Sequence, residues 1–351
     1  MSKETWKLLE VEDLKKHFPL RRGHLGLKAI ETVKAVDGVS FYINQGETFG
    51  LVGESGSGKT TVGRSILRAI EPDSGRVRFQ LNPEEVTDVL ALNRKNLKAF
   101  RKQMQLIFQD PFSSLNPRMT VRDIIAEPLI INRICSGSQL EERVRELAHQ
   151  CRLNVEHLRR FPHAFSGGQR QRIGIARALA LNPKLIVCDE PVSALDVSVQ
   201  AEILNLLIDL QNTLSLTYLF VAHDLSVIEY ICDRIGVMYL GRIVETAPTA
   251  ELFSRPLHPY TEALMSAIPA PDPDAPMNPA ILQGEIPSPI NPPSGCHLHP
   301  RCRYAKEICE KERPEWKEYG KDHFSACHFS GTLDLMVTKV EHNLHPYNQE
   351  D

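Results

Sequence analysis

The sequence lacks a long apolar run. No stretch of about 18 consecutive apolar residues occurs among its 351 residues, so we expect no segment that crosses a bilayer. The first eighteen residues alternate charged and apolar side chains, without the continuous apolar stretch of a signal peptide. We therefore predict a chain that stays in the cytoplasm and reaches a membrane only through a partner.

A basic excess is also missing. Forty-one Lys and Arg residues stand against 44 Asp and Glu residues, a net charge of −3, which argues against a broad nucleic-acid surface. Apolar residues (42%) and charged residues (24%) are present in the proportions of an ordinary globular protein. The length exceeds one typical core and predicts one large domain with an appendage, or two domains.

Short apolar segments alternate with amphipathic ones along the first 270 residues. We expect strands at 47–52, 104–108, 185–188 and 218–222. We expect helices at 59–70, 138–153, 173–181 and around 199–210, the second of them opened by a capping box of Ser138 and Glu141. Strands that alternate with helices in this way predict a parallel α/β core.

A phosphate-binding loop follows the first expected strand and precedes the first helix. It fits the pattern G-x4-G-K-[ST] with Gly53, Glu54, Ser55, Gly56, Ser57, Gly58, Lys59 and Thr60, and Thr61 comes next. Glycines let successive N–H groups point at phosphate oxygens, and the helix N-terminus adds positive charge. We expect Lys59 to reach the β- and γ-phosphates and Thr60 to bind Mg²⁺. The alternative is a Gly/Ser-rich surface turn.

Two acids end the apolar segment 185–188. Asp189 is expected to hold Mg²⁺, and Glu190, which points to the other side, to polarise the attacking water. A capped turn is the plainer interpretation. A second anion-binding device, the group Ser166, Gly167, Gly168 and Gln169, stands before the helix at 173–181. Two such devices in one chain make sense if they serve different nucleotides.

Residues 165–172 resemble the signature motif of the ATP-binding-cassette ATPases. The resemblance implies a P-loop NTPase fold of the ABC type: a parallel-sheet core, an antiparallel β subdomain, a helical subdomain at about 112–178 and a small Cys-rich C-terminal extension. It also implies a head-to-tail dimer in which each ATP lies between the phosphate loop of one subunit and the signature of the other. Further motifs match in order: Gln109 as the Mg²⁺-contacting glutamine, Ser193 and Asp196 in the loop at the dimer interface, and His223 at the γ-phosphate.

Three stretches resemble the oligopeptide and dipeptide importers in particular: 109–119, 255–261 with its His-Pro-Tyr, and the terminal cysteines. Residues 34–41 look like the second of the two paired ATPases of that branch. The resemblance implies ATP hydrolysis to ADP and phosphate that drives solute uptake across the bacterial inner membrane, from its cytoplasmic face. The implied partners are a homologous ATPase, two permeases and, indirectly, a solute-binding protein. Residues 112–131 would receive the permease, and no residue here reads the solute.

Two other classes compete with the importer: a soluble cassette ATPase of DNA repair or translation, and a P-loop kinase. The first usually carries a long coiled coil or two cassettes, and the second has no use for the motif at 166–169. The adenine platform is open between Phe18 and Val33, because residues 21–32 look like an inserted loop. ATP is expected, since no guanine-reading Asn-Lys-x-Asp motif occurs in the sequence.

The composition changes after residue 268. We expect the ATPase domain at 1–268, a Pro-rich linker at 269–294, a Cys-rich unit at 295–329 and a polar tail at 330–351. Cys135, Cys151, Cys188 and Cys232 are expected to be reduced structural thiols.

Four further cysteines crowd the Cys-rich unit: Cys296, Cys302, Cys309 and Cys327. Four thiols in a small cytosolic unit suit a [4Fe–4S] cluster or Zn²⁺, and the resemblance to dipeptide-importer ATPases favours the cluster. Nearby His297, His299, His323 and His328 leave a mixed zinc site open.

Overall fold

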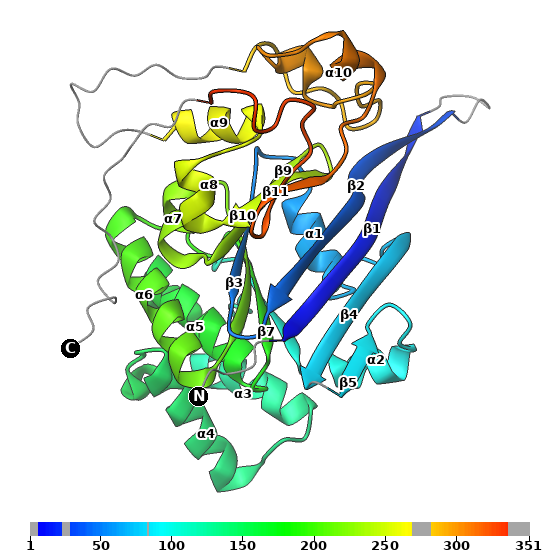
Figure 1. The fold of residues 1–351 in the computed structure, drawn as a ribbon. Helices are drawn as coiled ribbons and strands as arrows, with labels where there is room; N and C mark the ends of the chain where they lie inside the picture. The colour runs from blue at the N-terminus through cyan, green and yellow to red at the C-terminus, as the bar shows by residue number, and fades with distance from the viewer. Residues whose placement is uncertain (1–5, 23–28, 83, 269–281, 336–351) are drawn as a thin grey trace. The chain divides into compact units, whose positions relative to one another are not determined.

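The computed structural model describes residues 6–22, 29–82, 84–268 and 282–335 (Figure 1). The chain forms two compact units, which are described separately. Unit 1 comprises residues 1–14, 40–49 and 60–222, and unit 2 comprises residues 15–39, 50–59 and 223–351.

Two long strands open the fold. β1 (Lys7–Arg22) and β2 (Ala29–Asn44) are neighbours in a sheet of order β2-β1-β4-β5. Within unit 1, β4 (Ser74–Asn82) and β5 (Glu85–Asp88) pair in antiparallel fashion, with Arg78 opposite Asp88. The expectation of an inserted loop at 21–32 was wrong at both ends, because β1 continues to Arg22 and β2 begins at Ala29; residues 23–28 lie outside the described part.

The parallel core predicted from the sequence lies in unit 1. β6 (Met104–Ile107), β7 (Leu185–Asp189) and β8 (Thr217–Val221) are parallel neighbours, with Met104 opposite Leu185 and Leu185 opposite Thr217. All residues of β7 and β8 are buried. Continuous apolar runs of this kind are what a strand covered on both faces requires.

The helices of unit 1 follow the expected order but differ at their ends. They are α1 (Lys59–Ile66), α2 (Arg94–Phe100), α3 (Val121–Ile131), α4 (Gly137–Gln150), α5 (Gly167–Leu179) and α6 (Val197–Leu214), with short 3-10 turns at Val155–His157 and Pro162–Ala164. α1 ends four residues early because Arg68 adopts a left-handed backbone, φ 49°. α5 begins six residues earlier than predicted, at the signature glycines.

The capping box expected at Ser138 is wrong. α4 begins at Gly137, so Ser138 lies inside the helix, and the preceding Ser136 makes no side-chain cap hydrogen bond. α3, α4 and α5 pack against one another, and Val144 and Leu147 of α4 are fully buried (Figure 1). The apolar stripe of α4 therefore holds this helical part together although the predicted cap is absent.

Unit 2 is built on antiparallel strands. β3 (Thr48–Val52) passes from unit 1 into unit 2 and leads to the phosphate loop. β9 (Arg234–Tyr239) and β10 (Arg242–Pro248) form a hairpin whose two turn residues, Leu240 and Gly241, both have positive φ, as a type I′ turn demands. β12 (His323–Ser325) pairs with β10, and β11 (Lys317–Gly320) pairs with β12.

Short helices complete unit 2. They are α7 (Leu225–Ile231), α8 (Thr249–Ser254), α9 (Pro259–Ser266), α10 (Glu307–Lys311) and a 3-10 turn at His299–Arg301. Residues 269–281 of the expected linker and 336–351 of the expected tail lie outside the described part. Ser330 is buried and donates to the Leu257 carbonyl (3.1 Å), so the chain stays packed on unit 2 to that point.

Candidate functional site

The phosphate loop wraps around its own lysine in unit 2. Lys59 is buried, and its Nζ donates to the carbonyl oxygens of Gly53 (2.7 Å) and Glu54 (3.0 Å). Ser57 is buried beside it, while Ser55 and Gly56 are exposed at the tip of the loop. Two backbone carbonyls of the loop therefore fix the position of the ammonium group, at a place where it can contact phosphate oxygens.

Two glycines of this loop cannot carry a side chain. A Cβ on Gly53 (φ 147°) would lie 2.1 Å from the Met238 carbonyl oxygen, and one on Gly58 (φ 107°) would lie 2.1 Å from the Ala35 carbonyl oxygen. Both obstacles are backbone atoms, so they cannot rotate away. The spacing of the motif thus has a packing cause as well as a phosphate-binding one.

Unit 1 joins Thr60 and Asp189, which the sequence analysis assigned to the same metal ion. The Thr60 hydroxyl donates to Asp189 Oδ1 at 2.7 Å, and Arg64 Nη2 lies 3.2 Å from Asp189 Oδ2. Asp189 is 1% exposed. Hydroxyl and carboxylate oxygens are the hard ligands that Mg²⁺ prefers, so this pair fits the ion. Arg64 was missed, although it lies one helical turn after Thr60.

Glu190 and Gln109 also meet in unit 1. Gln109 Nε2 donates to Glu190 Oε2 at 2.8 Å, so the exposed glutamine after β6 reaches the acid after β7. Glu190 has φ 48°, a left-handed conformation that costs about 1–3 kcal/mol for a non-glycine residue. Its N–H donates to the Val221 carbonyl at 2.9 Å, which ties this turn to the neighbouring strand. Strained backbone of this kind often marks a functional site.

The signature residues form the N-terminus of α5. Ser166 Oγ accepts from the Gln169 N–H (3.3 Å) and Gln169 Oε1 accepts from the Ser166 N–H (3.1 Å), a reciprocal capping box. Ser166 and Gln169 are exposed. A Cβ on Gly168 would lie 2.3 Å from Val199 Cγ1, whereas Gly167 has more room. Because Ser166 and Gln169 are exposed at the N-terminus of a helix, this end of α5 is able to receive an anion.

The loop between β7 and α6 places the two interface candidates. The Ser193 hydroxyl donates to the Glu190 carbonyl at 3.1 Å, and Asp196 caps α6 by accepting from the Val199 N–H at 3.0 Å. That backbone hydrogen bond lowers the pKa of Asp196, so its carboxylate is charged. Both side chains are exposed. Ser193 therefore couples this loop to the backbone of the residue expected to polarise water.

Four further residues were named from the sequence. His223 is exposed, two residues after β8. Thr61 is in the first turn of α1. Phe18 lies on β1, half-buried, with Lys16 Nζ 5.3 Å from its ring centre, so it presents an aromatic face that is already in contact with a cation. Val33, the other adenine candidate, is half-buried on β2.

The terminal cysteines share one small part of unit 2 and are free thiols. The Cys296 N–H donates to the Cys309 carbonyl at 2.8 Å. Burial raises the pKa of Cys296 to about 12 and that of Cys327 to about 11, and the neighbouring thiols of the group contribute to both shifts. Across the described ranges, however, no three His, Cys, Asp or Glu side chains gather at metal-binding distance, so the arrangement is not a formed metal site.

Two of the other cysteines have the burial expected of structural thiols. Cys151 and Cys188 are buried, and burial raises the pKa of both thiols, that of Cys151 to about 12. Such thiols are inert and structural. Among the described helices, none combines the length and apolarity that a bilayer span needs.

Comparison with known families gives two matches. The model of the ABC transporter family matches residues 36–193, and that of the oligopeptide/dipeptide transporter C-terminal region matches residues 244–309. A putative peptide import ATP-binding protein of Brucella ovis is 53% identical over 320 residues, which cover 91% of this chain and 97% of that protein. The oligopeptide transport ATP-binding protein AppF of Bacillus subtilis is 50% identical over 324 residues, 92% of this chain and 97% of AppF.

Solved structures agree on the fold. A dimeric post-hydrolysis state of the ATP-binding cassette MJ0796 bound to ADP and Pi superposes with a TM-score of 0.59 at 28% identity, over 69% of this chain and 98% of that chain. The protein cbiO1 of Clostridium perfringens, part of an ABC transporter complex, superposes with a TM-score of 0.58 at 26% identity, over 71% and 91% of the two chains.

Proposed function

Because the chain belongs to the ABC transporter family, as an ATP-binding protein of the peptide-import type, we propose that it hydrolyses ATP to drive peptide uptake through a membrane permease. The supporting likenesses are the relatives described as peptide or oligopeptide import ATP-binding proteins, and the match of residues 244–309 to the C-terminal region of such transporters. Dipeptides, oligopeptides or a related solute fit this proposal equally, since solute selection belongs to its partners.

The assignment of catalytic roles is based on the two acids at the end of β7, which face different partners. Asp189 turns to the Thr60 hydroxyl, and the next residue, Glu190, turns to Gln109. We assign Thr60 and Asp189, assisted by Gln109, to the magnesium ion, and Glu190 to the attacking water. Bound Mg²⁺ supplies Lewis-acid stabilisation of the phosphate oxygens. Lys59 and N–H groups of the phosphate loop bind the phosphates. The Glu54 N–H is not among them, because it donates to the Tyr260 hydroxyl at 2.8 Å.

Exchanging Glu190 for Gln tests this assignment. We expect Glu190→Gln to bind ATP like the wild type and to hydrolyse it about 10²–10⁴-fold more slowly, the usual loss when a positioned base is removed. The amide keeps the shape and the contact to Gln109, so folding should be preserved. Lys59→Ala is the matched control, because it should lose ATP binding instead of turnover. Near-normal turnover in Glu190→Gln would remove Glu190 from this role.

The signature group supports a two-cassette working unit. We propose that Ser166, Gly167, Gly168 and Gln169 bind the ATP of a homologous second ATPase, with Ser193 and Asp196 at the shared interface and His223 at the γ-phosphate. Their support is an exposed helix N-terminus and two exposed side chains on the neighbouring loop. Glu190→Gln with ATP should form a stable complex with the partner ATPase in size-exclusion chromatography. Loss of that complex in a Ser166→Arg version would support the shared site.

The permease-facing surface is proposed at residues 112–131, with the subunit on the cytoplasmic face of the membrane. Phe112 is 59% exposed and lies under the Arg170 guanidinium, 4.0 Å from carbon to ring centre. Arg170 belongs to α5, the helix that begins directly after Ser166. A displacement of Phe112 by the permease would therefore act on this helix through the contact with Arg170. We propose Phe18 as the adenine platform, with Val33 as the alternative.

For the four terminal cysteines we propose a [4Fe–4S] cluster, with Zn²⁺ as the alternative occupant. The support is chemical: four free thiols in one small part of unit 2, near enough to influence one another's pKa. Since they are not gathered around a point, binding must draw them together and release their protons. Anaerobic purification with iron, sulfide and zinc analysis tests this. A folded, colourless and metal-free protein would end the proposal.

A further inference from the structure

Glu54 of the phosphate loop has every polar group engaged, and two of its partners come from the C-terminal part of the chain. Its N–H donates to the Tyr260 hydroxyl at 2.8 Å, and its carbonyl accepts from Lys59 at 3.0 Å. Its carboxylate takes both ends of the Arg301 guanidinium, with distances of 2.8 and 3.0 Å from Nη1 and Nη2. All of these residues belong to unit 2.

Arg301 is a buried arginine directed at a single carboxylate. It is 7% exposed, and its Nη1 also lies 3.4 Å from the Tyr239 hydroxyl. The Tyr239 ring packs against the Tyr260 ring, with centroids 4.6 Å apart. The guanidinium of an arginine stays charged in proteins, so this contact is an ion pair. A two-point Arg–carboxylate contact of this geometry fixes orientation as well as charge.

The backbone that carries Arg301 is also held. Arg301 ends the 3-10 turn that begins at His299, its N–H donates to the Leu298 carbonyl at 2.9 Å, and the turn lies between Cys296 and Cys302. The packing of the Cys-rich unit therefore sets where the guanidinium lies.

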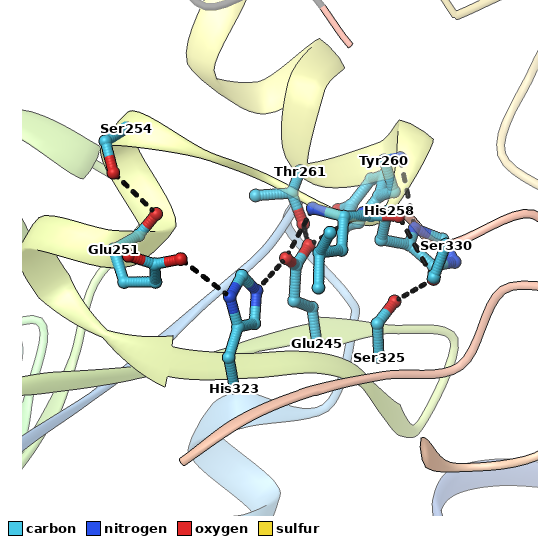
Figure 2. A network of polar contacts seen from close by, with 10 residues as sticks. Glu245, Glu251, Ser254, His258, Tyr260, Thr261, His323, Ser325 and Ser330 are labelled. Atoms are coloured by element: carbon cyan, nitrogen blue, oxygen red, sulfur yellow. Dashed lines mark hydrogen bonds and ion pairs between the residues drawn. The ribbon is translucent and has the colours of Figure 1, made fainter. Parts of the chain in front are cut away.

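A buried carboxylate, Glu245, holds the segment that carries Tyr260 (Figure 2). Glu245, which is 0% exposed, accepts from the N–H groups of Leu257 (2.7 Å) and His258 (3.0 Å) and from the Thr261 hydroxyl, and its other side meets His323 Nε2 at 2.8 Å. His258 Nδ1 then caps α9 by accepting from the Tyr260 N–H at 3.1 Å. The His-Pro-Tyr segment is thus folded around one acid and points its tyrosine at Glu54.

The charge of Glu54 explains why Arg301 is needed. A carboxylate one residue into a phosphate-binding loop repels the phosphates of a nucleotide, and the two charges interact through a partly buried, low-dielectric region. Arg301 cancels that charge and holds the side chain back. Resting on the proposed nucleotide role of the loop, we propose that Arg301 and Tyr260 are positioning residues for ATP binding, through which the C-terminal region sets the charge and shape of the phosphate loop.

The test is a double-mutant cycle on ATP binding by the purified full chain, measured by titration calorimetry with Mg-ATP. Arg301→Ala should weaken ATP binding about ten-fold, because it leaves Glu54 charged and unpaired. Arg301→Ala combined with Glu54→Gln should recover to within about two-fold of Glu54→Gln alone, since no charge then remains to be cancelled. Arg301→Lys should fall between Arg301→Ala and the wild type, because it restores charge without the two-point geometry.

Two readouts separate this role from simple structural support. The loss in Arg301→Ala should shrink in 0.5 M salt and should appear as a raised KM for ATP at nearly constant kcat, as expected for lost phosphate binding. Tyr260→Phe, which removes the acceptor of the Glu54 N–H, should cost several-fold with little dependence on salt. Circular dichroism of each variant shows whether it is folded.

The ATP affinities of the variants distinguish failure of this inference from failure of the phosphate-loop assignment. Wild-type ATP affinity in Arg301→Ala, or a double variant as weak as Arg301→Ala, would overturn the inference. ATP binding that survives Lys59→Ala would instead refute the phosphate-loop assignment on which the inference rests. Weak binding in Arg301→Ala with recovery in the double variant supports it.

Discussion

Replacing Glu245 by Ala tests whether this buried acid organises the His-Pro-Tyr segment of unit 2. The carboxylate is completely buried and receives two backbone N–H groups and the Thr261 hydroxyl, with His323 on its other side. His323 would still face Glu251, 3.7 Å from its Nδ1, whereas the N–H groups of Leu257 and His258 are fixed by the backbone. Each buried donor left without a partner costs about 1–3 kcal/mol.

Two stranded N–H groups, together with the cavity left by the side chain, predict that Glu245→Ala lowers the free energy of unfolding by about 4 kcal/mol. That is a large share of the roughly 5–15 kcal/mol by which domains are stable. Glu245→Gln keeps one carbonyl acceptor and should lose about half as much. The assay is urea unfolding followed by circular dichroism, with the same chain and buffer for all variants.

Glu251 provides the matched control. Its carboxylate faces the other nitrogen of the same histidine, His323 Nδ1, at 3.7 Å, but its side chain is 43% exposed. A long contact to a carboxylate that is largely in solvent contributes little, so Glu251→Ala should change stability by less than about 1 kcal/mol. If Glu245→Ala cost no more than Glu251→Ala, the claim that a buried acid organises the His-Pro-Tyr segment would be refuted.

Two further predictions concern pH and the loop. Burial lowers the pKa of His258 to about 3 from an ordinary 6.5, so the unfolded chain binds a proton at this residue that the native chain does not, and stability falls as pH drops from about 6.5 towards 3. Between pH 7 and 5.5 this loss is about 1 kcal/mol. His258→Asn keeps a capping acceptor but does not titrate, so its free energy of unfolding in urea should fall by about 1 kcal/mol less over the same pH range. Gly53→Ala should abolish ATP binding because its Cβ meets the Met238 carbonyl oxygen, whereas Gly56→Ala, whose Cβ meets nothing within 4 Å, should lose less; equal losses in calorimetry would contradict the packing argument.

Sequence patterns predicted the parts of the site that are local in the chain. The phosphate loop and the acids after β7 are each defined by neighbouring residues, so their spacing was enough to point to them. The residues before α5 were noted from the sequence as well, but the helix was expected to begin six residues later than Gly167. The parallel strands β7 and β8 were predictable as well, because both are fully buried and a strand buried on both faces is a nearly continuous apolar run. The meeting of Gln109 with Glu190 follows from these, since both residues come directly after neighbouring parallel strands.

The long strand β1 was missed for a physical reason. Leu8, Leu9 and Val11 are all buried, so neighbouring as well as alternate residues face the core, and after Val11 the next buried residue is Leu14. Asp13 lies between them with φ 45°, which shifts the side-chain alternation by one residue. A strand with such an irregularity has no clean period of two, and mixed charges along it resemble a loop.

The contact between Glu54 and Arg301 could not be predicted for a different reason. The two residues are 247 positions apart, and no local sequence pattern links them. A glutamate inside a phosphate-binding loop is, however, a local conflict, because it places a negative charge where the ligand is also negative. A conflict of that kind predicts a compensating cation somewhere in the fold, though not its position. Once the C-terminal region is seen to supply that cation, its attachment to an ATPase acquires a physical consequence: any change that displaces the turn between Cys296 and Cys302 exposes the Glu54 charge and weakens the hold of the loop on ATP.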